Sequence, residues 1–177
     1  MSAAEPARRC LREIYEAQWW PWLIPVCTPF EPHQHGRSPC TSQGKVPIES
    51  GWNRKAQERA LVTGRLEERL DQLDQHLDAG GNIGLALPPG IVVLDADDFQ
   101  AAAWLVDQYP TAPFQRTNAG GHLVTTYDPT RQTISARTKV EIAPGVVVDL
   151  RVGGKSQIVV DPSIHWTGAL YEWGRTL

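Results

Sequence analysis

The sequence predicts a protein of the α+β class, with helices packed on a mostly antiparallel sheet. Two helical patterns and several short apolar runs, joined by irregular connections, indicate this class. The composition agrees, because 177 residues with 41% hydrophobic and 21% charged are typical of one globular domain with a real core. We expect one domain over residues 1–177, with a lobe of helices and loops over 1–80 and a sheet over 81–177.

The first eighty residues predict two helices around a loop-rich segment. Residues 4–17 form a charged helical pattern, which a Trp-rich cluster at 19–22 closes. Residues 25–52 are rich in Pro, Gly, His and Ser, which favours short strands joined by ordered loops. Further on, leucines recur at spacings of four, three and four and define one helical face that ends at Gly80-Gly81: Leu66, Leu70, Leu73 and Leu77.

The second part of the chain predicts the sheet. Residues 82–87 and 90–95 are short apolar runs separated by Pro88-Pro89, and we expect them to form an antiparallel pair. Asp98 is placed to cap a helix that runs through Ala101 and Val106. Further strands are predicted over residues 122–127, 139–142, 146–150 and 156–160.

Three acidic residues follow apolar runs in this predicted sheet. Because side chains of a strand alternate between its faces, Asp95 and Asp97 project to the same side, and Asp149 ends a second run. Carboxylates converging from two strands suit hard divalent cations such as Mg²⁺ or Mn²⁺. The alternative is that the Asp-x-Asp pair is only a turn or a helix cap.

A glycine turn leads directly into a histidine between the two acidic motifs. The backbone N–H groups of Gly120 and Gly121 can approach a phosphate closely, and His122 follows them. Together with the acids, this turn predicts a site that holds metal and triphosphate. Taken alone, His122 is a hydrogen-bonded structural histidine.

Net charge, the apolar pattern and the cysteine count do not favour a nucleic-acid-binding protein, a membrane protein or a secreted protein. The formal charge of −3 gives no global attraction to nucleic acid, so such binding would need a local basic patch. The apolar stretch at 19–26 is short and broken by two prolines, so we expect no membrane span or signal peptide. Three cysteines fit a reducing compartment, and we expect a cytoplasmic protein of a bacterial host cell.

These motifs, in this order, resemble the bifunctional DNA primase/polymerase domain of the archaeo-eukaryotic primase superfamily, found in phage and plasmid replication proteins. The likeness covers most of the chain and depends on the order of the segments rather than on any one of them. The segments are Gly44-Lys45-Val46-Pro47, Gly51-Trp52, Asn82 to Ala86, Asp95-Ala96-Asp97, Gly121-His122, Val148-Asp149 to Gly154, and Pro162 to His165 with Gly168, Tyr171 and Trp173.

The resemblance implies template-directed nucleotidyl transfer in a cleft that binds metal and nucleotide. It makes Asp95, Asp97 and Asp149 the catalytic carboxylates that hold Mg²⁺ or Mn²⁺. The residues implied to contact the triphosphate are His122, Gly120, Gly121, Arg151 and Lys155, with Lys45 serving the same purpose or contacting the template backbone. For Arg151, simple pairing with a neighbouring carboxylate such as Asp149 is an equal alternative.

The implied partners are a single-stranded DNA template, a primer and a dNTP or NTP. A helicase, either as a C-terminal portion or as a separate protein, is a further partner by analogy, because the chain resembles a fragment of a longer replication protein. No membrane partner is expected. Two other functions compete: a DNA-binding initiator module without turnover, and a metal-dependent phosphodiesterase. The three acids favour the enzyme over the first, and the triphosphate-side residues favour it over the second.

A separate set of soft and borderline ligands lies within fourteen residues of the N-terminal half: Cys27, His33, His35 and Cys40. Two thiolates and two imidazoles are chemically adequate for tetrahedral zinc. Their spacing differs from the common paired-cysteine pattern. A structural zinc site and a loop rich in polar residues both remain open.

Overall fold

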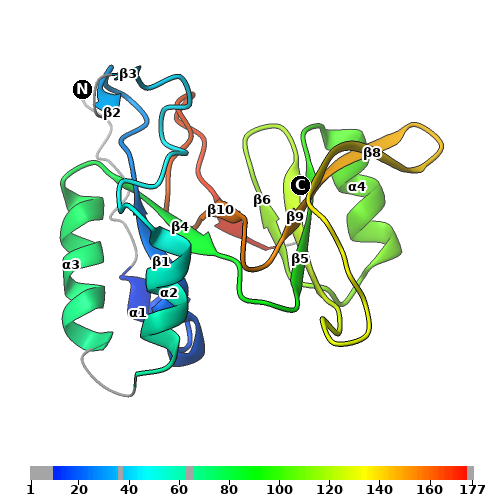
Figure 1. Cartoon of the computed structure of the whole chain (residues 1–177). Helices are drawn as coiled ribbons and strands as arrows, with labels where there is room; N and C mark the ends of the chain where they lie inside the picture. Colours follow the sequence, from blue (N-terminus) through cyan, green and yellow to red (C-terminus); the bar gives the residue numbers. More distant parts are fainter. Residues whose placement is uncertain (1–9, 36–37, 63–65, 175–177) are drawn as a thin grey trace.

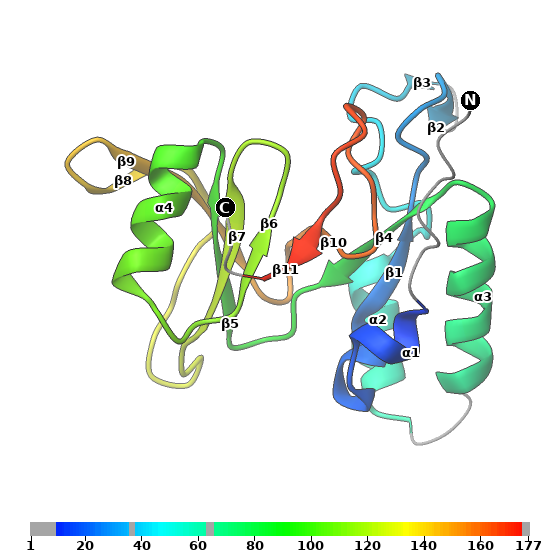
Figure 2. The same ribbon diagram turned by 180° about the vertical axis from the view of Figure 1, so that it is seen from behind.

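The computed structural model describes residues 10–35, 38–62 and 66–174. Two lobes lie side by side, as Figure 1 and the reverse view in Figure 2 show. One lobe contains a three-stranded sheet with the order β1-β4-β10, and the other a six-stranded sheet with the order β11-β6-β7-β5-β9-β8. Every strand pairing in both sheets is antiparallel. The predicted α+β class with a mostly antiparallel sheet is therefore confirmed.

The six-stranded sheet contains most of the predicted strands. Its members are β5 (Ile91–Ala96), β6 (Phe114–Arg116), β7 (Gly121–Thr126), β8 (Arg137–Ala143), β9 (Val146–Val152) and β11 (Glu172–Trp173). The short strands β6 and β11 were not predicted. Helix α4 (Phe99–Gln108) begins as predicted, because the side chain of Asp98 accepts a hydrogen bond from the Ala101 N–H at 2.7 Å. This helix covers one face of the sheet (Figure 1).

The first lobe packs three helices against its small sheet. The strands are β1 (Leu23–Val26), β4 (Asn82–Ala86) and β10 (Gln157–Val160), and the helices are α1 (Leu11–Ile14), α2 (Trp52–Ala60) and α3 (Leu66–Asp78), with the 3-10 helix η1 (Ala17–Trp22). The predicted leucine face of α3 is confirmed, since Leu70, Leu73 and Leu77 are buried in the core. Helix α2 was not predicted. The loop-rich segment contains the two-residue strands β2 (Gln34–His35) and β3 (Ser38–Pro39).

The helix predicted over residues 4–17 is confirmed only in part, because α1 covers Leu11–Ile14 and ends three residues early. Residues 4–9 lie outside the described residues, and α1 ends at Ile14, where Tyr15 turns into extended backbone. The reason is tertiary, because Tyr15 is buried and its hydroxyl donates a 2.6 Å hydrogen bond to the Asp161 carbonyl. If the helix continued through Tyr15, the side chain would point in another direction and would not make this contact with Asp161.

The antiparallel pair predicted for residues 82–87 and 90–95 is wrong. Strand β4 pairs with β1 and β10, whereas β5 pairs with β7 and β9 in the other sheet. A tight hairpin needs positive φ angles at the turn, which the ring of Pro88 or Pro89 cannot adopt. All five residues of β4 are buried, so this strand is central and needs a partner on each side. The two prolines instead carry the chain from one sheet to the other.

The division of the chain at residue 80 stays a prediction. Strand β4 pairs with β1 on one side and with β10 on the other, so two strands beyond that position belong to the sheet of the first lobe. Within the described residues, no helix combines the length and the apolar character that crossing a membrane would require.

Candidate functional site

The antiparallel register aligns four polar side chains across the six-stranded sheet. Asp95 on β5 lies opposite Asp149 on β9 and opposite His122 on β7. His122 in turn lies opposite Gln115 on β6. Residues directly opposite each other in antiparallel strands share a face of the sheet. The register therefore forms one polar row, Gln115–His122–Asp95–Asp149, although Asp95 and Asp149 lie 54 positions apart in the sequence.

The two faces of this sheet have different surroundings. The neighbouring row contains Phe114, Leu123, Leu94 and Leu150, which pack in the core beneath α4. Because side chains alternate along a strand, the polar row must point to the opposite face. That face meets the first lobe, since Val93 and Val124 belong to the core that includes Leu85 and Ile158. The polar row is thus directed into the space between the two lobes.

Asp95 is a mostly buried carboxylate with partners on both oxygens. Its Oδ2 accepts hydrogen bonds from Nε and Nη2 of Arg151, each at 3.1 Å, and its Oδ1 lies 3.3 Å from Nε2 of His122. Burial alone would raise its pKa. The hydrogen bond from His122 and the charge of Arg151 outweigh burial and lower the pKa of Asp95 to about 2. Asp95 is therefore ionised at neutral pH.

Asp149 shares the same guanidinium. Its Oδ2 accepts a 2.9 Å hydrogen bond from Nη2 of Arg151, and its Oδ1 accepts a 2.8 Å bond from the backbone N–H of Lys139. Lys139 has φ of 53° and lies at an irregularity in the β8–β9 register. A left-handed backbone at a non-glycine residue is strained. Here it accompanies a backbone hydrogen bond to Asp149.

Arg151 forms a cationic bridge between two of the three predicted metal ligands. The ion pair between Arg151 and Asp149, which the sequence left as an alternative, is therefore present. The guanidinium lies between two carboxylates, which favour a positive charge there. Asp97 has a different environment, because burial and the negative charges of Asp95 and Asp149 raise its pKa. A divalent cation would relieve this repulsion, and carboxylate oxygens are the ligands that Mg²⁺ and Mn²⁺ prefer. The donor set thus fits such a metal.

His122 is held in place by residues that the sequence did not single out. Gln115 is fully buried, and its Oε1 accepts from the Asp161 N–H while its Nε2 donates to the Val159 carbonyl. The second hydrogen on Nε2 then points to Nδ1 of His122 at 2.9 Å. Nδ1 is therefore the acceptor, and Nε2 carries the ring hydrogen that faces Asp95. Tyr171 stacks on the imidazole, with ring centroids 6.3 Å apart.

No sequence signal identified Gln115. It is a single glutamine in a three-residue strand, and its importance depends on backbone groups of β10 and the segment after it. Tyr171 was recognised only as part of the closing segment of the resemblance. Burial and the charge of Asp95 raise the pKa of Tyr171 to about 12, so its hydroxyl stays protonated.

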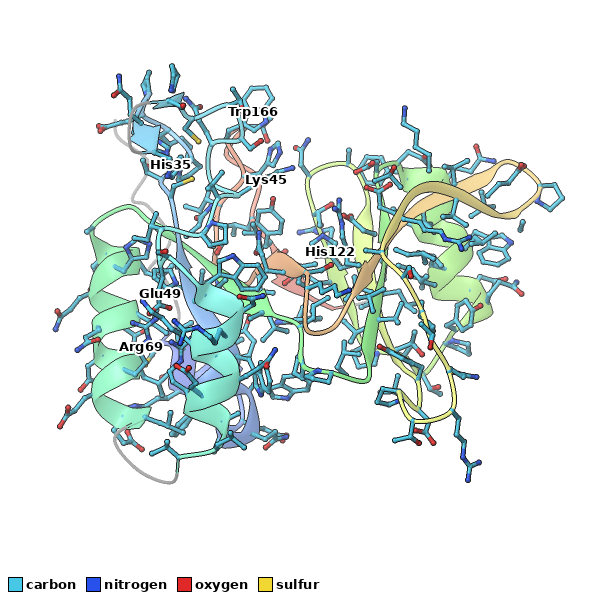
Figure 3. All side chains as sticks on the ribbon, in the orientation of Figure 1. His35, Lys45, Glu49, Arg69, His122 and Trp166 are labelled. Atoms are coloured by element: carbon cyan, nitrogen blue, oxygen red, sulfur yellow. The ribbon has the colours of Figure 1, made fainter. Side chains whose placement is uncertain are left out.

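A cavity of about 530 Å³ opens beside the polar row. It lies between the lobes, since the second lobe contributes Asp95, Asp97, His122 and Arg151 and the first contributes Lys45 and Gln157 to Val159. Thr117, Asn118 and Ala119 form another part of the wall. In Figure 3, Lys45 and His122 lie on opposite sides of the space between the lobes. The volume is within the range of ordinary small-ligand pockets, roughly 300–1,000 Å³.

The other predicted phosphate-contact residues lie outside the described lining of this cavity. Lys155 is exposed in the turn between β9 and β10. Gly120 and Gly121 are buried, and a Cβ atom would lie 1.9 Å from the Ala96 carbonyl oxygen at the first and 2.0 Å from the Phe114 ring at the second. Close packing therefore already requires glycine at both positions. The roles of these residues stay predictions.

Two sets of polar contacts connect the walls of the cavity, one around the buried Asn82 and one at the exposed Thr167. The side chain of Asn82 donates to the carbonyls of Gly44 and Ile164 and accepts from the Ile164 N–H, so it joins the Lys45 segment to the closing segment. The Thr167 hydroxyl donates to Asn118 at 2.8 Å and joins the closing segment to the β6–β7 turn. The cavity walls are thus held by polar contacts between distant parts of the chain.

The four predicted zinc ligands converge elsewhere in the first lobe. One ligand atom from each of Cys27, His33, His35 and Cys40 lies within 4.8 Å of the others. This group is separate from the carboxylates of the polar row.

Comparison with known proteins identifies the family of the chain. Residues 13–177 match the family described as bifunctional DNA primase/polymerase, N-terminal, or Prim-Pol. No curated protein sequence matches the chain. The family match supports a replication function of the DNA primase/polymerase type, a nucleotidyltransferase-type enzyme and DNA and nucleotide substrates, and the family generally uses divalent metals. Since the match covers nearly the whole chain and both acidic motifs, this protein belongs to the Prim-Pol family of bifunctional DNA primase/polymerase N-terminal domains.

Proposed function

We propose that this domain catalyses template-directed nucleotidyl transfer at the cavity between its lobes, starting and extending DNA strands in phage or plasmid replication. One observation carries the proposal: the register of three strands aligns His122, Asp95 and Asp149 on one face of the sheet, and Asp95 and His122 line the cavity. Carboxylates for metal and a hydrogen-bond donor for phosphate are then adjacent. Both are needed by an enzyme that positions and neutralises a triphosphate.

Asp95, Asp97 and Asp149 would hold Mg²⁺ or Mn²⁺ in this proposal. Such ions, when bound, stabilise the attacking and leaving oxygens of an in-line displacement. The raised pKa of Asp97 supports the assignment, because burial and two neighbouring negative charges disfavour its ionised form without a further cation. Negative charge is thus concentrated at the cavity wall beyond what Arg151 alone offsets.

Arg151 and His122 would exchange partners when substrate binds. Arg151 is about one-third exposed, with 38% of its side chain accessible, so its guanidinium is free to turn from the carboxylates towards an anion. Its planar fork suits two phosphate oxygens. His122 would redirect its Nε2–H from Asp95 to a phosphate oxygen, while Gln115 keeps the ring in the same orientation. Lys45, an exposed point charge on the opposite wall, would complete the phosphate contacts.

The alternative of a DNA-binding initiator module without turnover explains fewer of these contacts. DNA binding is driven by neutralising phosphates, and a cluster of three carboxylates opposes the approach of a DNA backbone. A metal-dependent phosphodiesterase would use the same carboxylates. It has no use for a cavity in which His122, Arg151 and Lys45 converge beside them, since a diester carries no triphosphate.

The test is incorporation of labelled nucleotides on single-stranded DNA, with and without a primer, in Mg²⁺ or Mn²⁺. The parent is compared with Asp95→Asn and Asp149→Asn, which keep the side-chain shape and remove one charge each. Asp107→Asn is the matched control, because Asp107 is an exposed acid on α4. We expect metal-dependent products from the parent and the control and a loss of at least 100-fold, or about 2.7 kcal/mol, in each site variant.

The unprimed reaction separates priming from extension. A folded parent that binds single-stranded DNA but yields no product under either condition would favour the initiator module. Shortening of the labelled primer in the absence of nucleotides, abolished by Asp95→Asn, would favour the phosphodiesterase.

A further inference from the structure

The Cys/His cluster of the first lobe lies at the end of β1, away from the polar row. Cys27 directly follows β1, His35 belongs to β2, and Cys40 directly follows β3, with His33 just before β2. Figure 3 shows His35 at the same end of the lobe as Lys45 and Trp166. The proposed nucleotidyl transfer uses none of these four side chains. Their convergence therefore needs a separate physical account.

Two distances between ligand atoms match edges of a coordination tetrahedron, and all four ligand atoms lie within 4.8 Å of one another. With Zn–S of about 2.3 Å and Zn–N of about 2.0–2.1 Å, tetrahedral geometry requires S···S near 3.8 Å and N···N near 3.3 Å. The sulfurs of Cys27 and Cys40 are 4.0 Å apart, and the Nε2 atoms of His33 and His35 are 3.2 Å apart. A disulfide would require the two sulfurs at about 2.05 Å, and the cysteines are free.

The hydrogen bond behind His33 orients the ring as a ligand. Nδ1 of His33 lies 2.8 Å from the Glu31 carbonyl oxygen, which can only accept, so Nδ1 carries the hydrogen. The lone pair of Nε2 then points into the cluster. A histidine that binds metal almost always donates its other ring N–H to a carbonyl or carboxylate in this way. This contact is independent of the distances among the four ligand atoms.

A metal also explains why these four groups are brought together. The Cys27 side chain is buried, and the other three ligand residues are partly buried. Two thiols and two imidazoles in contact gain little from one another. A soft or borderline cation gives all four a common partner, with both thiol protons released on binding. Four protein ligands leave no open position, which is typical of structural zinc.

We propose that Cys27, His33, His35 and Cys40 bind one structural zinc ion, which fixes the segment carrying Lys45 at the wall of the cavity. The mechanical connection is short. Cys40 precedes Lys45 by five residues, the Cys27 N–H donates to the Val46 carbonyl at 2.9 Å, and the Gly44 N–H donates to the Thr28 carbonyl at 3.0 Å. The ion would tie the end of β1, the β2–β3 strands and the Lys45 segment together.

The first experiment measures metal in the full chain, purified without chelator, by inductively coupled plasma mass spectrometry. We expect one zinc ion per chain in the parent and a loss of most of it in Cys27→Ser and Cys40→Ser. Cys10→Ser is the matched control, because Cys10 lies outside the cluster and contacts Asp74 instead. The conservative variant Cys40→His keeps a ligand and should retain zinc. A parent without stoichiometric zinc, or one with an equivalent content of another metal, would overturn the proposal.

The second experiment uses the parent alone and is insensitive to misfolded variants. Exchange of the bound metal for Co²⁺ should produce the visible d–d bands and thiolate charge-transfer absorption of a tetrahedral site with two sulfurs. Thiol titration should find one reactive cysteine before chelation and three after it. A spectrum without tetrahedral cobalt bands contradicts the site, as does a chelated protein with only one thiol, which would indicate a Cys27–Cys40 disulfide.

The positioning role has its own readout, which does not require polymerase activity. Removal of zinc should accelerate amide hydrogen exchange in peptides covering residues 40–47 and leave peptides of β5 and β9 unchanged. Equal exchange with and without zinc would refute the positioning role. Zinc content and exchange are measured without nucleotide, so failure of the proposed function and failure of this inference are distinguishable.

Discussion

Replacing Gln115 by methionine should destabilise the protein and release His122 from its present orientation. Methionine keeps the length and approximate volume of glutamine but can neither donate nor accept the same hydrogen bonds. Three buried contacts are lost, to His122, the Val159 carbonyl and the Asp161 N–H. At about 1 kcal/mol for each net hydrogen bond, the free energy of unfolding should fall by about 3 kcal/mol. For a domain of this size, that corresponds to a fall in Tm of roughly 6–12 °C.

The assay is equilibrium unfolding in chelator-containing buffer, followed by tryptophan fluorescence. Gln132→Met is the matched control, because Gln132 is exposed and an exposed substitution should change stability by less than about 0.5 kcal/mol. Nitrogen-15 NMR of the His122 ring provides a second readout: the parent should be the Nε2–H tautomer, and the variant should show a mixture. An unchanged unfolding midpoint together with an unchanged tautomer would refute the reasoning.

Three further changes test the charges and surfaces around the site. The pKa of Asp95 in the folded protein lies below its value in the unfolded chain, so the carboxylate stabilises the fold fully above about pH 4 and loses this effect towards pH 2. In chelator-containing buffer, the difference in unfolding free energy between the parent and Asp95→Asn should therefore shrink over that range. Glu49→Gln should lower the free energy of unfolding, measured in denaturant, by about 2 kcal/mol, since it leaves two partly buried arginines without their carboxylate. The control Glu58→Gln removes an exposed ion pair and should cost under about 0.5 kcal/mol. Equal losses in the two variants would contradict this reasoning. Trp166 is 61% exposed and lies near Lys45 (Figure 3). Trp166→Ala should weaken single-stranded DNA binding about fivefold through loss of base stacking, as measured by fluorescence anisotropy. The control is Phe99→Ala at an exposed residue of α4, and an equal loss of affinity there would exclude a local contact between Trp166 and DNA.

The cluster around Glu49 shows a structural use of charge that sequence reasoning did not reach. Figure 3 shows Glu49 and Arg69 facing each other between α2 and α3. Glu49 lies 3.2 Å from Arg59 on α2 and 3.2 Å from Arg69 on α3. Burial lowers the pKa of Arg69, and the charge of Glu49 opposes that shift. One carboxylate thus joins two helices that are separated in the chain.

Local patterns predicted the elements whose signal lies within a few neighbouring residues. The leucine spacing of α3 and the cap of α4 by Asp98 are such signals, and the structure has both. Strand β6 has only three residues, and α2 has one buried residue, Ala56, so neither carries a periodic pattern long enough to identify. The prolines after Leu87 were interpreted as a turn between paired strands. They instead separate two sheets, because burial of both faces of β4 depends on partners far away in the chain.

The same distinction between local sequence pattern and long-range contact applies to the candidate site. The sequence by itself determined the residue types: two acids at alternate positions of one strand, a third acid ending another, a histidine after a glycine turn, and four Cys/His ligands within fourteen positions. Strand periodicity is a local property, so the direction of these side chains relative to their neighbours was accessible without a fold.

Only the tertiary structure decided which residues meet. It aligned Asp95 with Asp149 and His122, set Arg151 between the two carboxylates, and supported the imidazole with Gln115. It also brought two sulfurs and two imidazole nitrogens to tetrahedral spacing around the end of β1. Strand register and contacts between lobes arise from pairing and burial over the whole chain, whereas residue spacing reflects only the nearest neighbours.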